Sequence, residues 1–297
     1  MFNWNDLESF LVLSRNKKLT HAAKKLNVES TTISRRILRL EQNLQTKLFV
    51  RNNKGYVLTD SGHKLLLIAE RIESETISIG ENFSSHSLNI SGTVRIAMPE
   101  GLGLDFFSKY LNEFYTLHPE IFIELVADTR SRNLLTKEID ISINLSRPTR
   151  GKLVSWKLTD YYLRLYASSR YIKSSKPINS LKDLNNHKFI SYIDDLIDYP
   201  ELRYLKDLEK NIKIVFKSNS LKAQLNAVSE SIGISLLHCF IAKKNKDLKI
   251  LLKNDIKIKR EYWIVVHEDL IKLKRVRAVI DFLTKKIKLN KKVFLDD

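Results

Sequence analysis

The segment from Ser30 to Arg39 places hydroxyl and guanidinium groups along one side of a predicted helix. Ile33, Ile37 and Leu40 recur at helical spacing and predict the buried side. The opposite side holds Thr31, Thr32, Ser34, Arg35, Arg36 and Arg39. Such hydroxyls and arginine forks read base edges and phosphates in a major groove, and a helix N-terminus attracts phosphate. We expect this surface to bind duplex DNA; the alternative is an ordinary solvated helix face.

Two shorter helices are expected to hold this segment in place. Leu7, Phe10 and Leu11 form one apolar stripe, and Asn5 with Glu8 can cap that helix. Thr20 is expected to cap a second helix, whose buried side is Ala22, Ala23 and Leu26. The third, longer helix opens at Ser30 or Thr31. A short helix, a tight turn and a longer helix predict a helix-turn-helix.

A β-hairpin is predicted to follow the third helix. Residues 48–51 and 56–58 are β-prone runs, and residues 52–55 read N-N-K-G, which favours a tight turn. Thr59 to Gly62 then cap a new helix. The whole pattern predicts a winged helix-turn-helix over residues 1–62, with the wing touching the DNA backbone or minor groove. The wing candidates are Arg51, Asn52, Asn53 and Lys54.

The amino-acid sequence of this segment resembles that of a known family. Residues 19–28 read L-T-H-A-A-K-K-L-N-V, and residues 32–37, 40–41, 48–51 and 58–62 continue the pattern. Together they are similar to LysR-type transcriptional regulators, over about forty residues without a gap. The resemblance implies sequence-specific DNA binding, with Thr20 and Ser30 added to the contact residues. Glu29 and Ser30 stand where the family often has Ser and Gln, which favours a different operator sequence.

Residues 63–90 are predicted to form a linker helix and a hinge. Leu65, Ile68, Ile72, Ile79 and Phe83 recur at spacings near three and four, among several glutamates. Such a helix can pair with a second copy of itself or pack on its own chain. The resemblance favours pairing. Two-fold symmetry then predicts a homodimer on a roughly palindromic operator, and the resemblance also favours a homotetramer.

Residues 91–297 are predicted to form an α/β domain, because short apolar runs alternate with helical patterns. Parallel sheets of this kind bind ligands outside the carboxyl ends of their strands. The expected strands are residues 94–98, 122–127, 139–145, 163–168, 189–193, 214–217, 233–237 and 262–267. The expected helices are residues 102–117, 134–137, 221–229 and 272–287.

The same region resembles the effector-binding domain of LysR-type regulators, which is built like a periplasmic solute-binding protein. The sequence motifs that match that domain are residues 91–96, 118–121, 139–143, 165–172 and 262–267. The resemblance implies two lobes, one of about 91–160 plus 269–297 and one of about 161–268. A small-molecule effector would bind between them.

The candidate effector residues follow from position in that fold. They are Pro99, Glu100, Gly101, Leu102, Gly103, Asp128, Thr129, Asn144, Asn219 and Ser220. Family members often place Ser or Thr at the first strand's end to hold a carboxylate, whereas this chain has Glu100. A carboxylate there can cap the protein's own helix and would repel an anion. We therefore expect that the effector is not a simple carboxylate, or that no small effector exists.

Composition limits the remaining functions. The chain has 297 residues and a net charge of +17, which suggests a polyanionic partner or reflects a general compositional bias. Between Arg15 and Lys64 there are 12 basic and 3 acidic residues, a net charge of +9 in the predicted DNA-binding domain. Residues 243–297 hold 17 basic and 8 acidic residues, another +9 without a DNA-binding motif, which supports the general compositional bias. A non-specific DNA binder is therefore a further alternative.

No enzyme is expected. The sequence holds no G-x-S-x-G motif, P-loop, H-E-x-x-H or paired-cysteine metal site, so no cofactor or metal is predicted. Cys239, the single cysteine, is expected to be a buried structural thiol. No apolar stretch is long enough to span a membrane and no signal peptide is present, which predicts a cytoplasmic protein with no membrane partner. RNA polymerase is an expected further contact. The alternative is a solute-binding or small-molecule-processing protein with an incidental helical N-terminus.

Overall fold

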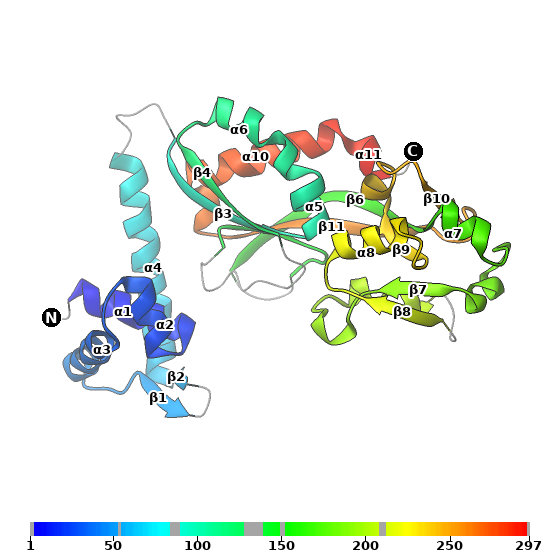
Figure 1. Cartoon of the computed structure of the whole chain (residues 1–297). Helices are drawn as coiled ribbons and strands as arrows, with labels where there is room; N and C mark the ends of the chain where they lie inside the picture. Colours follow the sequence, from blue (N-terminus) through cyan, green and yellow to red (C-terminus); the bar gives the residue numbers. More distant parts are fainter. Residues whose placement is uncertain are drawn as a thin grey trace. The chain divides into compact units, whose positions relative to one another are not determined.

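The computed structural model describes residues 3–52, 55–83, 90–127, 139–148, 152–207 and 212–295. The chain divides into two compact units, Met1–Leu88 and Asn89–Asp297, and each is treated by itself (Figure 1). Among the described residues, no helix is long and apolar enough to cross a bilayer.

The first unit is a helix-turn-helix followed by a hairpin and a long helix. Its elements are α1 (Trp4–Asn16), α2 (Leu19–Leu26), α3 (Ser30–Leu44), β1 (Phe49–Asn52), β2 (Gly55–Leu58) and α4 (Asp60–Phe83). The predicted stripes form one core: Phe10, Ala22, Ile33 and Leu40 are fully buried together, and Leu65 of α4 packs against them. The predicted winged helix-turn-helix is confirmed.

Two predicted caps of this unit are wrong. The side chain of Asn3, not Asn5, accepts a hydrogen bond at the start of α1, from the backbone N–H of Asn5. Helix α2 begins at Leu19 after an extended Lys18, so Thr20 lies inside the helix and does not cap it. The cause is Lys17, which ends α1 in the left-handed conformation and leaves room for only one residue before the next helix. The Thr59 cap is confirmed, since its hydroxyl accepts from the N–H of Gly62 at 3.0 Å.

Gly55 fixes where the wing returns toward the helices. Its φ is +109°, a conformation that side chains disfavour. A Cβ atom at this position would lie 2.2 Å from the carbonyl oxygen of Lys17. The next residue, Tyr56, donates its N–H to that same oxygen at 2.8 Å. The wing is thereby attached to the end of α1.

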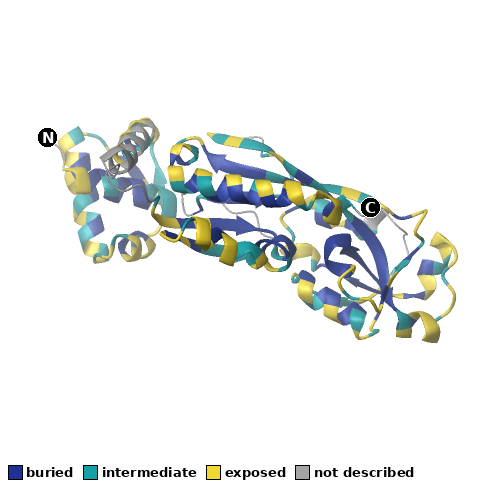
Figure 2. Ribbon diagram, turned by 90° about the horizontal axis from the view of Figure 1, so that it is seen from above, coloured by how far each residue is buried: buried dark blue, intermediate teal, exposed yellow. Residues whose placement is uncertain are grey.

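The second unit is built on a seven-stranded sheet. Its strands are β3 (Gly92–Met98), β4 (Ile121–Ala127), β5 (Ile141–Asn144), β6 (Leu153–Ser168), β9 (Ser235–His238), β10 (Leu248–Leu251) and β11 (Ile258–His267). The order is β10-β6-β11-β5-β3-β4, and β9 also pairs with β6. A separate parallel pair joins β7 (Lys188–Ser191) to β8 (Lys213–Lys217). In Figure 2 these strands are largely buried, while exposed residues form stripes along the helices.

The helices of this unit cover the sheet. They are α5 (Glu100–Asp105), α6 (Leu111–Leu117), α7 (Ser169–Ser174), α8 (Leu221–Ser229), α9 (Cys239–Ala242), α10 (Lys274–Leu289) and α11 (Lys291–Leu295). Helices α6 and α10 lie side by side on one face (Figure 1), where Phe114 and Phe282 meet with ring centroids 5.2 Å apart. The predicted single helix over 102–117 is broken at Phe106, whose backbone leaves the helical region and whose ring packs on Phe294.

The sheet is mixed, which corrects the expectation of parallel pairing throughout. β3 pairs in parallel with β4 and β5, as predicted. β6 and β11, however, run antiparallel to each other and to their other neighbours. These two long strands link a first group of elements (β3–β5, α5, α6 and α10) to a second group (β7–β10 and α7–α9). Residues 134–137, predicted as helix, lie outside the described residues.

Candidate nucleic-acid interface and ligand site

The polar side of α3 is open to solvent. Thr31 and Arg35, one helical turn apart, are exposed, whereas Ile33 and Leu40 are fully buried. Ser30, Thr32, Ser34 and Arg36 are partly exposed. The structure therefore brings the predicted α3 residues to one surface at the N-terminal half of the helix, where free backbone N–H groups also point outward.

Two arginines of that surface are held by α1. Arg39 donates from Nε to Asp6 at 2.7 Å and from a second nitrogen to the other carboxylate oxygen. Asp6 is fully buried and Arg39 is about half exposed. The hydrogen bonds to Asp6 raise the pKa of Arg39 above its ordinary value. Arg36 donates to the hydroxyl of Ser9 at 3.3 Å. These contacts fix the rotation of α3 about its axis, a role of Asp6 and Ser9 that the sequence analysis missed.

The wing residues extend the same unit. Arg51 and Asn52 are exposed on β1, while Asn53 and Lys54 lie outside the described residues. Glu41, at the end of α3, anchors the start of the wing. Its carboxylate accepts the backbone N–H groups of Leu48 at 2.9 Å and Phe49 at 3.3 Å. Thr20 is exposed on α2.

In the second unit, Glu100 contacts Ser220 across 120 residues of sequence. One carboxylate oxygen accepts the Ser220 hydroxyl at 2.8 Å, and the other accepts the backbone N–H of Leu221 at 2.5 Å. Glu100, the first residue of α5, thereby caps α8. Glu100 thus caps a helix of its own protein, as expected, and that helix is α8.

The neighbouring residues of α5 pack against the second group of elements. A Cβ atom on Gly101 would lie 2.6 Å from Cδ1 of Ile241 and 2.8 Å from Cδ2 of Leu221, so any larger residue here would require these side-chain ends to shift. Lys244 donates to the Asp105 carboxylate at 3.0 Å. Leu102 is fully buried. Pro99 and Gly103 are also buried.

The other predicted ligand residues form no hydrogen bond with Glu100 within the described part of the chain, or lie outside it. Asn144 accepts a hydrogen bond from Ser142 of its own strand, at 2.7 Å, and Asn219 is exposed before α8. Asp128 and Thr129 lie outside the described residues. Cys239 is a fully buried thiol. Within the described ranges, no group of three or more metal-ligating side chains comes together.

Both units match models of known protein families. Residues 4–63 match the family model described as a bacterial regulatory helix-turn-helix protein, lysR family, and residues 89–288 match the LysR substrate binding domain. Together these models span most of the chain.

Individual relatives are similar over most of their lengths. The uncharacterized HTH-type transcriptional regulator YkuM of Bacillus subtilis is 23% identical, covering 94% of this chain and 95% of that protein. The glycine cleavage system transcriptional activator of Escherichia coli is 23% identical, covering 92% and 90%. Among solved structures, CrgA from Neisseria meningitidis is 20% identical, with a TM-score of 0.59 and coverage of 97% and 99%. A full-length OxyR from Pseudomonas aeruginosa is 16% identical, with a TM-score of 0.70 and coverage of 97% and 95%.

Proposed function

The chain belongs to the LysR family of DNA-binding transcriptional regulators, and from this premise we propose which of its residues bind the operator and what its ligand domain can accept. Family members bind DNA and small-molecule effectors and form oligomers. They are transcription regulators and not enzymes. The two family models match both units, which supports the regulator and not a solute-binding protein with an incidental N-terminus.

The proposed operator contacts lie on α3 and the wing. The residues that read base edges in the major groove are Ser30, Thr31, Thr32, Ser34 and Arg35. Arg36 and Arg39 contact phosphates from positions set by α1. The contact to the DNA backbone and minor groove is completed by Thr20, Arg51, Asn52, Asn53 and Lys54. The observation that supports this most is the exposure of Thr31 and Arg35 opposite a fully buried apolar side.

We propose that residues 63–90 join two copies of the chain. Ile68 and Ile72, one helical turn apart on α4, are 47% and 36% exposed, which leaves an apolar strip without cover in the single chain. Pairing through this strip gives a homodimer on a roughly palindromic operator, and two dimers form a tetramer. In this account the DNA-binding domain is residues 1–62 and the protein acts in the cytoplasm, where it can meet RNA polymerase.

The ligand domain, residues 91–297, is proposed to respond to something other than a simple carboxylate. Glu100 already places a carboxylate at the N-terminus of α8, where an anionic effector would otherwise be favoured. An effector can act only if it binds one arrangement of the domain better than another, and such coupling is typically about 1–3 kcal/mol.

A gel-shift experiment tests the proposed function. The full chain is mixed with DNA from upstream of its own gene and with a scrambled duplex of equal length, at two salt concentrations. We expect tight binding to the first duplex only. Affinity for both should fall steeply with salt, by roughly 10³ or more between about 50 and 200 mM for six or more phosphate contacts. Equal binding to both duplexes would instead indicate a non-specific DNA binder.

A further inference from the structure

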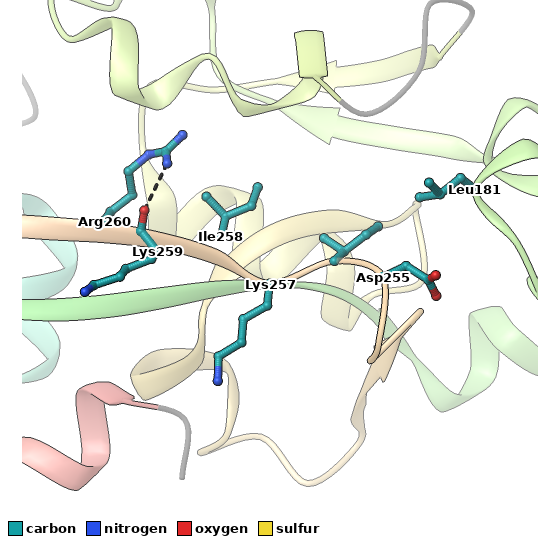
Figure 3. Close-up of a pocket in the computed structure, with 7 residues that line it drawn as sticks. Leu181, Asp255, Lys257, Ile258, Lys259 and Arg260 are labelled. Carbon is teal, nitrogen blue, oxygen red and sulfur yellow. Dashed lines mark hydrogen bonds between the residues drawn. The ribbon is translucent and has the colours of Figure 1, made fainter.

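Two hollows in the surface of the second unit have the volume of a small-ligand site. One of them, of about 390 Å³, is lined by Leu181 and residues 255–260 (Figure 3). Lys259 forms an ion pair with Asp160 at 3.2 Å, and Arg260 donates to the carbonyl oxygen of Lys259 at 3.0 Å. The ammonium of Lys257 lies 4.3 Å from the centroid of the Tyr162 ring. All three basic side chains of this hollow thus have partners within the chain.

The other hollow, of about 420 Å³, lies where α6 ends beside α10, and we name it the α6–α10 hollow. It is lined by Ile90, residues 117–118 and one side of residues 274–285. The two helices lie side by side (Figure 1) and run antiparallel, because Phe114 meets Phe282 while Glu113 pairs with Lys286, one turn further along α10. The end of α6 therefore adjoins the N-terminal half of α10. The lining contains none of the predicted effector residues.

Four apolar side chains converge on the α6–α10 hollow. Leu117, the last residue of α6, is 59% exposed, and it lines the hollow together with Ile90, Ala278 and the ring of Phe282. Apolar residues on a protein surface are usually scattered singly, whereas these four share one concave surface. The apolar body of a ligand would be removed from water there.

The remainder of the lining is positively charged. Lys274, Arg277 and Lys285 lie on the same side of α10, with Asp281 as the single acid. No side-chain hydrogen bond or ion pair joins Arg277 or Lys285 to another residue within the described part of the chain, Asp281 included. Arg277 directly precedes Ala278 in the half of α10 that adjoins α6. Its guanidinium is thus placed to bind an anionic group at the border of the apolar surface, with a fork that suits carboxylate or phosphate.

We propose that the α6–α10 hollow binds a small amphiphilic anion, with its head group on Arg277 and its apolar body against Leu117 and Phe282. A purely polar anion would leave the apolar surface uncovered, and a neutral apolar molecule would leave the cations unpaired. Duplex DNA is disfavoured, because its phosphates need no apolar surface and Asp281 would repel them. The ligand would also contact Ile90, at the start of the second unit, where the chain arrives from the linker.

Calorimetric titration of the full-length protein tests the site. The probes are hexanoate and phenyl phosphate, which join an anionic head group to an alkyl or an aromatic body. Acetate supplies a head group without a body, 1-hexanol a body without charge, and hexylammonium a body with the opposite charge. We expect saturable binding of at least one probe, with a Kd of about 1 mM or below. Each of the three comparison compounds should bind about tenfold more weakly or worse.

Three variants locate the binding on the protein. Arg277→Ala should weaken binding of the probe by about tenfold or more, because a charge-assisted hydrogen bond is lost. Leu117→Asn should weaken it by roughly fivefold or more, because apolar contact is lost. Lys288→Ala removes an exposed cation from the next part of α10, outside the hollow, and should bind the probe like the wild type. All three positions are exposed, so the variants should melt like the wild type.

Four results would overturn the proposal. They are no saturable binding of hexanoate or phenyl phosphate, equal affinity for any comparison compound, unchanged affinity in both Arg277→Ala and Leu117→Asn, and an equal loss of affinity in Lys288→Ala. The titration needs no operator DNA. Failure of the amphiphile site is therefore distinguishable from failure of the proposed DNA binding.

Discussion

His238 shows how a single buried residue sets the pH response of stability. Burial lowers its pKa to about 3, and the charge of Asp105 offsets this only in part. In the unfolded chain the same imidazole titrates near 6.5. Between these values the unfolded state binds the extra proton, so the free energy of unfolding falls as the pH decreases from about 6.5.

In the variant His238→Phe, the free energy of unfolding should depend less on pH below about 6.5. The wild type is expected to lose up to about 1.4 kcal/mol of unfolding free energy per pH unit through this residue. Phenylalanine keeps a ring against Tyr161 and removes the titration. Denaturant melts of the full chain at pH 4 to 8 measure the difference, with exposed His63→Gln as the control. Identical pH profiles for the wild type and His238→Phe would contradict this assignment.

At the same scale, the sequence predicts which side chains of α3 are exposed better than it predicts the residues that hold them in place. The polar side of α3 follows from helical periodicity alone, and its exposure agrees with that prediction. The partnership of Arg39 with Asp6 does not follow, because it depends on how α1 crosses α3. Glu100 could be identified as a cap by its residue type. Its partner Ser220 could not, because only the tertiary fold brings them together.

At the scale of elements, Glu41 ties the wing to α3. Glu41→Ala removes the acceptor for the N–H groups of Leu48 and Phe49. We expect local stability to fall by about 2–3 kcal/mol, the upper part of the range for hydrogen bonds to a charged group, because two N–H groups lose their acceptor. Hydrogen exchange at these two amides should accelerate by roughly 30–150-fold. Glu41→Gln, which keeps one acceptor oxygen, should show a smaller change, and equal exchange in all three proteins would argue against the anchor.

A second prediction concerns α5 and α8. Glu100→Ala leaves the Ser220 hydroxyl and the N–H of Leu221 without their acceptor. The melting temperature should fall by a few degrees, from a loss of about 1.5–3 kcal/mol. Added acetate should restore part of it by occupying the vacated position. The exposed Glu120→Ala is the control. If acetate stabilises the wild type as much as the variant, Glu100 does not hold the anion position.

The boundaries of helices and strands show where the local sequence pattern is sufficient to predict an element. Helix α8 spans residues 221–229 as predicted, since Ser220 accepts from the N–H of Ala223 and caps it. The predicted strand at 163–168 is only the end of β6, which begins at Leu153. Its first part is rich in polar residues because one side forms an ionic ladder, in which Lys157 pairs with Asp160 and Glu261. Such a strand lacks the continuous apolar run that identifies buried strands.

At the scale of the whole molecule, two units with different chemistry share one chain. The first exposes a basic, hydroxyl-rich helix side, and the second encloses buried phenols with raised pKa values and a carboxylate, Glu100, that caps α8. The family and the fold could be predicted from the sequence motifs, as the two family models confirm. The mixed sheet and the stacking of the buried Tyr161 on Tyr262 could not, because antiparallel pairing of β6 with β11 joins residues about 100 positions apart.

The most direct measurement of the central claim is footprinting of Arg35→Ala on the operator, beside the wild type and the exposed Lys249→Ala. Truncating an arginine that contacts a base should weaken operator binding by about 1–3 kcal/mol, or roughly 5–150-fold, and leave the oligomeric state unchanged. Lys249→Ala should footprint like the wild type. A footprint of Arg35→Ala at the wild-type protein concentration would contradict the claim that the exposed side of α3 reads duplex DNA.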